Sequence, residues 1–103
     1  MNALNFINGV FVDATDGQTL TNLNPATGQT IGTIARSKDS DVEEAVKAAA
    51  SAQEAWSSLD MLERATWLDR LADGLEARKE ELAHRESRDT GKPLALARRV
   101  DAQ

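Results

Sequence analysis

Few side chains in this sequence could carry out covalent or acid–base chemistry. None of the 103 residues is a cysteine, which excludes a thiol nucleophile, a thiolate metal site and a disulfide within them. His84 is the one histidine. For catalysis or metal binding it would need a convergent cysteine, aspartate, serine or second histidine, and none stands at ligand spacing from it. We therefore interpret His84 as a solvated helix residue and predict no catalytic residue in the chain.

The 17 aspartates and glutamates are interpreted mostly as surface charge. Several stand four residues from an arginine, which is the spacing of ion pairs on a helix surface, each worth about 0.2–0.5 kcal/mol at best. These pairs are Asp60 with Arg64, Glu81 with Arg85, and Arg85 with Asp89. No two carboxylates can be singled out as a general acid and a general base.

The glycines predict turns rather than a phosphate-binding loop. Gly28 and Gly32 flank a predicted strand, but the Gly-x-Gly-x-x-Gly pattern is missing and no Gly-Lys-Ser/Thr follows a strand. Gly91-Lys92-Pro93 follows a helix, where glycine ends the helix and lysine is favourable beside the carbonyl end. We therefore predict no cofactor-binding residue.

Most of the helix signal lies between Ser40 and Asp89. Ser40 and Glu43 have the spacing of a capping box, so a helix is expected to begin at Ser40. Asp60 and Glu63 have a second capping spacing, which predicts the start of a longer helix.

The longer helix is expected to bend or end between Leu75 and Lys79, because Gly74 lies inside it and Lys79 falls on its apolar side. A third helical piece then runs to about Asp89. Gly91 and the proline after it end this piece, and residues 94–103 begin another helical pattern.

Short strands are predicted before the helices. Asn8-Gly9 between two β-branched and aromatic runs is a strong hairpin signal, because both residues accept the positive φ angles of a type I′ turn. Residues 20–23 form a third candidate strand and residues 30–34 a fourth. Between these two, the sequence Asn24 to Gly28 predicts a tight corner, since the proline keeps Asn24 out of the helical region.

One helix face carries an apolar stripe that these residues do not cover. Its members recur at helical spacing: Met61, Ala65, Leu68, Leu71, Ala72, Leu75 and Leu82. Much of the apolar content is alanine and there are only four aromatic residues, so the remaining apolar surface is expected to come from elsewhere. We therefore expect the chain to be part of something larger.

Composition excludes several classes of protein. The net charge of −5, with both signs interspersed, disfavours a nucleic-acid partner. No apolar run is long enough to span a bilayer, and the first residues lack the pattern of a secretory signal. We expect a soluble, cytoplasmic α+β chain, with a hairpin and short strands in residues 1–36 and a helical segment in residues 37–103.

Several short motifs occur in a distinctive order along the chain. They are Phe6-Ile7-Asn8-Gly9, Asn24-Pro25-Ala26-Thr27-Gly28, Ile31, Asp41-Val42-Glu43-Glu44-Ala45-Val46-Lys47-Ala48-Ala49, Trp56, Glu63-Arg64, Leu71-Ala72-Asp73 and Asp89-Thr90-Gly91-Lys92-Pro93. Each motif is weak alone, but the ordered set resembles the N-terminal portion of an NAD(P)-dependent aldehyde dehydrogenase. The resemblance runs from about Asn5 to Gln103.

The resemblance implies an oxidoreductase that converts an aldehyde to a carboxylic acid, with NAD or NADP as coenzyme. In the family a cysteine attacks the aldehyde, hydride passes to the nicotinamide, and a glutamate activates water to hydrolyse the thioester. These residues and the coenzyme-binding sheet lie downstream of the matched region, so none can be carried over. The chain alone is expected to be inactive. Its expected partner is the remainder of the polypeptide, with residues 37–103 packed on the coenzyme-binding domain in a homodimer or homotetramer.

One site is implied by the resemblance. Family members often hold Na⁺ or K⁺ with main-chain oxygens before the Asn-Pro corner and with the carboxylate before the Gly-Lys-Pro turn, and hard cations suit oxygen ligands. The matching positions are Asn22 or Leu23, and Asp89. The other interpretation of Asp89 is a helix-end residue paired with Arg85.

A second hypothesis for the whole chain is a standalone helical module that docks on a partner through Leu68, Leu71 and Leu75.

Overall fold

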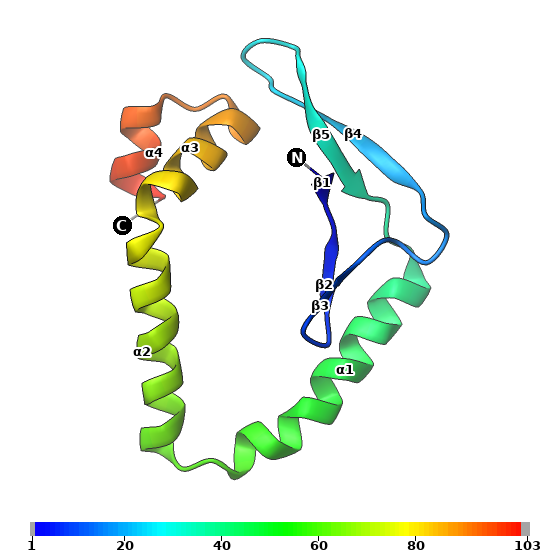
Figure 1. Ribbon diagram of the computed structural model, residues 1–103, viewed down its shortest axis with the longest axis vertical. Helices are drawn as coiled ribbons and strands as arrows, with labels where there is room; N and C mark the ends of the chain where they lie inside the picture. The colour runs from blue at the N-terminus through cyan, green and yellow to red at the C-terminus, as the bar shows by residue number, and fades with distance from the viewer. Residues whose placement is uncertain (1, 102–103) are drawn as a thin grey trace. The chain divides into compact units, whose positions relative to one another are not determined.

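The computed structural model describes residues 2–101 and shows short strands followed by helices (Figure 1). This order confirms the predicted α+β class. The elements are β1 (Asn2–Ala3), β2 (Asn5–Ile7), β3 (Val10–Val12), β4 (Thr19–Leu23), β5 (Thr30–Ala35), α1 (Asp39–Ser58), α2 (Met61–Ala77), α3 (Lys79–Thr90) and α4 (Leu94–Val100).

The chain divides into two compact units. The first contains the described residues up to Asn22 together with Ile31–Leu59, and the second contains Leu23–Thr30 together with the described residues from Asp60 onward. Strands give way to helices between Ala35 and Asp39, beside the expected boundary at residue 36. The compact units follow a different division, because α1 groups with the strands and the corner after β4 groups with the later helices.

The predicted hairpin is confirmed in the first unit. β2 and β3 pair antiparallel, with Phe6 opposite Phe11 and their ring centroids 4.9 Å apart. Asn8 and Gly9 both have positive φ angles, of 51° and 81°. Both central residues of a type I′ turn need this conformation, which asparagine and glycine tolerate better than other residues.

The other three strands form a separate sheet, in the order β1-β5-β4. β4 and β5 occupy the two stretches predicted as strands. β1 was not predicted: it is two residues long, and it is a strand because Asn2 and Ala3 pair in parallel with Thr33 and Ile34 of β5. A segment this short has no period of its own, so only the pairing defines it.

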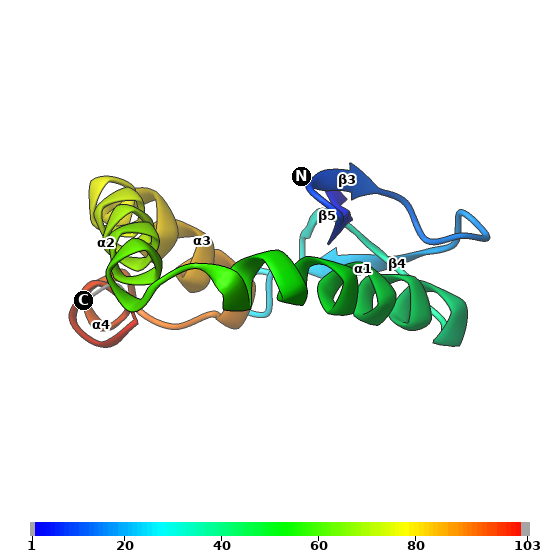
Figure 2. The same cartoon turned by 90° about the horizontal axis from the view of Figure 1, so that it is seen from below.

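The expected start of the first helix was wrong by one residue, and its cap is a different one. α1 begins at Asp39 and runs unbroken to Ser58 (Figure 2). The main-chain amide of Lys38 donates to the Asp41 carboxylate at 2.8 Å. The carboxylate of Asp41, rather than the Ser40–Glu43 pair, therefore anchors this end, because the loop before β4 also binds it.

The helix boundaries of the second unit agree with the sequence patterns. The Asp60 carboxylate accepts from the Glu63 amide at 2.8 Å, and the Asp60 amide donates to Glu63 Oε2 at 3.2 Å, which is the predicted capping box. Arg78 separates α2 from α3 at the expected place. Gly91 ends α3 in the left-handed conformation, with a φ of 74° and its amide bonded to the Ser87 carbonyl.

The buried apolar residues of the described chain are three alanines, Ala14, Ala83 and Ala97. α3 and α4 meet at Ala83 and Ala97, with Leu94 packed against them. No large side chain among residues 2–101 is fully buried. Met61, Leu68, Leu71 and Leu75 of α2 keep between 52% and 79% of their surface exposed, so the apolar stripe has no cover within its unit.

Candidate functional site

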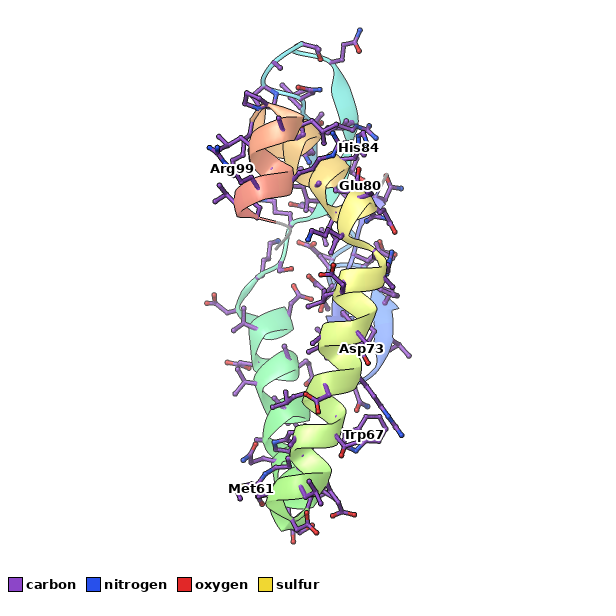
Figure 3. All side chains as sticks on the ribbon, turned by 90° about the vertical axis from the view of Figure 1, so that its left-hand side faces the viewer. Met61, Trp67, Asp73, Glu80, His84 and Arg99 are labelled. Atoms are coloured by element: carbon purple, nitrogen blue, oxygen red, sulfur yellow. The ribbon has the colours of Figure 1, made fainter. Side chains whose placement is uncertain are left out.

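His84 is exposed on α3, as expected for a solvated residue. It projects from the same side of the helix as Glu80, one turn earlier (Figure 3). The Glu80 carboxylate is engaged elsewhere, since it accepts three hydrogen bonds of 2.8–3.1 Å from the Arg98 guanidinium of α4. These bonds are the main reason that the pKa of Glu80 lies below its ordinary value. Within residues 2–101 no three histidine, cysteine or acidic side chains are grouped closely enough to bind a metal ion.

The carboxylates of α3 serve as ion-pair partners of arginines. Glu81 binds Arg85 at 2.6 Å, as the i, i+4 spacing predicted, and it also takes a two-bond contact from Arg78 at 2.9 Å. The Arg78 contact is the first cause that lowers the pKa of Glu81. Because these groups are exposed, the pairs contribute modestly to stability and give no residue the properties of a general acid.

Of the positions expected to hold a monovalent cation, Leu23 and Asp89 belong to the second unit, whereas the alternative Asn22 belongs to the first. Leu23 is the last residue of β4, and Asp89 stands in the last turn of α3. The corner after Leu23 is tightly bonded: the Gly28 amide donates to the Asn24 carbonyl at 2.7 Å and the Ala26 amide to Asn24 Oδ1 at 2.9 Å.

The turn after Asp89 lies against this corner. A Cβ atom placed on Gly91 would be 3.1 Å from Cγ of Pro25, so the two turns are in contact two residues beyond Leu23 and Asp89. The contact joins Gly91 to Pro25 and does not itself involve Leu23 or Asp89. The ligand set itself stays a prediction.

Asp41 is a buried, multiply hydrogen-bonded residue of the first unit, and the sequence analysis missed its role. Its side chain is 6% exposed. One carboxylate oxygen accepts from the amide and the hydroxyl of Thr15, at 2.8 and 2.6 Å, and the other accepts from the Lys38 amide. The Thr15 hydroxyl is the first cause that holds the pKa of Asp41 below its ordinary value. Asp41 thus ties the loop after β3 to the start of α1.

The signal that could have found Asp41 is its position three residues after Lys38, where an acidic side chain can accept from the amide that precedes the helix. Its bonds to Thr15 span 26 residues and leave no trace in local spacing. These bonds connect Asp41 to a loop and a helix start of the same chain, so they help to hold the fold.

Lys92 links α3 to the end of α4 through two ion pairs. The Lys92 ammonium contacts Glu86 at 3.2 Å and Asp101 at 2.6 Å, and the Ser87 hydroxyl donates to the Lys92 carbonyl at 2.7 Å. The Asp101 hydrogen bond is the first cause that raises the pKa of Lys92. Lys92 therefore fixes the turn between these helices, a role that the sequence analysis did not predict.

The apolar stripe of α2 forms a surface, which we call the α2 face and define as Met61, Leu68, Leu71 and Leu75. Near the end of α2 it continues into a groove of about 390 Å³. The groove is lined by Ala72, Asp73, Leu75, Glu76, Lys79, Leu82 and Asp101. Aliphatic groups with charges around them suit contact with another protein surface better than they suit chemistry.

None of the helices formed by residues 2–101 combines the length and the apolar character needed to cross a lipid bilayer. The polar clusters of these residues connect loops and helices.

Comparison with known proteins gives a consistent result. The family model described as the aldehyde dehydrogenase family matches residues 11–103. Among solved structures, PnpE from Pseudomonas sp. WBC-3 is 42% identical to this chain, with a TM-score of 0.94 over 99% of it. PnpE has also been solved in complex with nicotinamide adenine dinucleotide.

Two further structures are similarly close. A putative aldehyde dehydrogenase from Burkholderia cenocepacia is 46% identical, with a TM-score of 0.93 over 97% of this chain. An NAD-dependent aldehyde dehydrogenase from Sinorhizobium meliloti is 37% identical, with a TM-score of 0.90 over 95% of it. The match covers 21% of PnpE and 20% of each of the other two proteins. This chain thus spans about a fifth of the length of the solved relatives that it matches.

Proposed function

The chain belongs to the aldehyde dehydrogenase family, and from that premise we propose that it supplies the N-terminal structural portion of an NAD(P)-dependent enzyme that oxidises an aldehyde to a carboxylic acid. The observation that carries the proposal is the match itself. The family model spans residues 11–103, and 95–99% of the chain matches much longer proteins at TM-scores of 0.90–0.94, two of which are described as aldehyde dehydrogenases.

The chain by itself is proposed to be inactive. It contains no cysteine, and the family's reaction begins with attack by a cysteine thiolate. Its own polar clusters, at Asp41 and at Lys92, are occupied in holding loops to helices. The contribution of these residues is therefore to shape a surface on which the remainder of an enzyme can be built.

The coenzyme of the complete enzyme is proposed to be NAD or NADP. Support comes from PnpE, which has been solved with nicotinamide adenine dinucleotide, and from the S. meliloti protein, which is described as NAD-dependent. The homodimer or homotetramer, the cytoplasmic location and the packing of residues 37–103 on a coenzyme-binding domain remain predictions from the family resemblance. The standalone helical module remains the alternative, and its docking face would be the exposed leucines of α2.

A chimera tests the proposal directly. This chain would replace the matching fifth of the B. cenocepacia relative, and NADH formation would be measured with a panel of aliphatic and aromatic aldehydes. We expect the chimera to oxidise the aldehydes that the intact relative oxidises, whereas the 103-residue chain alone gives no turnover. A folded chimera without activity, measured beside an active intact relative, would contradict the proposal.

A further inference from the structure

We propose that the α2 face is a docking surface that engages the remainder of an aldehyde dehydrogenase polypeptide even when the two are separate chains. This inference rests on the proposed function and deepens it by naming the surface and the kind of partner. The face consists of Met61, Leu68, Leu71 and Leu75, which are 79%, 58%, 60% and 52% exposed.

The exposure of this face is a property of a well-formed helix. α2 has a complete capping box at Asp60, so the helix is held by its own sequence. Elsewhere in the same unit the chain does bury apolar groups, since Ala83 and Ala97 are 0% exposed where α3 meets α4. The leucines of α2 therefore lie uncovered on an ordered helix, which is the state of an interface before its partner is added.

The groove at the end of the face indicates the chemistry of the partner. Ala72, Leu75 and Leu82 contribute apolar lining, and Asp73, Glu76, Lys79 and Asp101 contribute charged groups. Two of the three carboxylates already have lysine partners, since Glu76 pairs with Lys79 at 3.6 Å and Asp101 pairs with Lys92 at 2.6 Å. The surface thus fits a partner with protruding aliphatic side chains and a basic residue that faces Asp73.

The net charge disfavours a second copy of this chain as the occupant. Two identical chains would each carry a net charge of −5, and this repulsion opposes their association. The relatives favour the other occupant. They show this conformation at TM-scores of 0.93–0.94 in proteins about five times longer, so some four-fifths of their length is available to cover the face.

Association of separate chains is feasible because the face belongs to one helix. Its four residues lie within Met61–Ala77, whose backbone bonds are internal to the helix. A partner can therefore add to the face by surface contact, without exchanging strands and without threading the chain.

A cleavable chimera tests this inference and separates it from the proposed function. A protease site would be inserted directly after Gln103 in the chimera described above, so that the protein folds as one chain and is then cut into two. Size-exclusion chromatography and NADH formation would be recorded before and after cleavage. We expect the two pieces to stay together and to keep their activity.

Substitutions on α2 identify the surface. Leu71→Glu and Leu75→Glu should each weaken the association of the cut pieces by about ten- to a hundredfold, because each removes a leucine that the association would bury. Leu62→Glu is the matched control: it has the same chemistry on the same helix, at a residue that is 76% exposed and lies outside the face. It should leave the association unchanged.

Hydroxyl-radical footprinting of the uncut wild-type chimera covers the case in which a leucine variant does not fold. The residues of the α2 face should react more slowly in the chimera than in the isolated chain, whereas Leu62 should react equally in both. Dissociation of the cut wild-type pieces, equal retention of all variants, or a stable dimer of the isolated chain would overturn the inference. An inactive uncut chimera would instead count against the proposed function.

Discussion

Gly91 should tolerate alanine poorly, for two separable reasons. Its φ of 74° lies in the left-handed region, where a Cβ costs about 1–2 kcal/mol. A Cβ there would also stand 3.1 Å from Pro25 Cγ and 3.6 Å from the Ala26 amide nitrogen. Such overpacking typically adds about 1–3 kcal/mol. Gly91→Ala should therefore destabilise the end of α3 by about 2–5 kcal/mol in total.

Gly28→Ala is the matched control for the backbone term. Gly28 has a similar φ of 71°, but no atom lies within 4 Å of its added Cβ. We therefore expect Gly28→Ala to cost only the conformational part, about 1–2 kcal/mol. The difference between the two substitutions measures the contact between the turn after α3 and the corner after β4.

Hydrogen exchange measured on the folded chimera gives the local opening free energies. The amide of residue 91, which donates to the Ser87 carbonyl at 3.0 Å, reports on the end of α3, and the amide of residue 28, which donates to the Asn24 carbonyl at 2.7 Å, reports on the corner. Adding Pro25→Ala to Gly91→Ala should recover about 1 kcal/mol or more of the loss. Equal costs at Gly91 and Gly28, to within about 0.5 kcal/mol, together with no recovery, would refute the close approach of the two turns.

Three further outcomes are expected. The pKa of Asp41 is lowered in the folded chain, so the hydrogen bonds between Thr15 and Asp41 should be present above the ordinary carboxyl pKa of 3.8 and be lost as the pH falls below it. Hydrogen exchange of the Thr15 amide across this range should therefore show less protection at the lower pH. Asp41→Asn should abolish this pH dependence. Asp60→Ala should destabilise the first turn of α2 by about 1 kcal/mol, seen as faster exchange of the Glu63 amide, with no change at α3. If Leu23 and Asp89 hold a monovalent cation, Na⁺ or K⁺ should stabilise the active chimera against heat more than tetramethylammonium does, and Asp89→Asn should remove the difference.

The features that the sequence predicted are those encoded within a few residues. Asn8-Gly9 accepts the two positive φ angles of its turn, Asp60 and Glu63 form their capping box, and the break at Arg78 falls where Gly74 and Lys79 indicated. In each case the physical cause lies within four residues of its effect. Local rules of this kind need no knowledge of the rest of the fold.

The features that were missed depend on distant partners. β1 exists through its pairing with residues 33 and 34, and Asp41 becomes an anchor through Thr15, 26 residues away. The expected helix start at Ser40 was wrong for the same reason. The Asp41 carboxylate, which also binds Thr15 of a distant loop, accepts from the Lys38 amide and caps the helix instead. The candidate cation positions came from family resemblance alone, since two separated residues carry no spacing signal.

With only alanines buried as apolar residues in the described part of the chain, the interactions that define its helices differ from those that usually stabilise a whole domain. Capping boxes, a left-handed glycine and ion pairs specify where each helix begins and ends, but each contributes about 1 kcal/mol or less. Burial of large aliphatic side chains usually supplies most of the stability of a domain, at about 1.5–3 kcal/mol each. Here those side chains, such as Leu68, Leu71 and Leu75, remain exposed, and alanines are the apolar residues buried within residues 2–101. The local sequence therefore specifies where most of the helices and strands form. Most of the free energy that stabilises the folded state is expected to come from the surface that covers the α2 face.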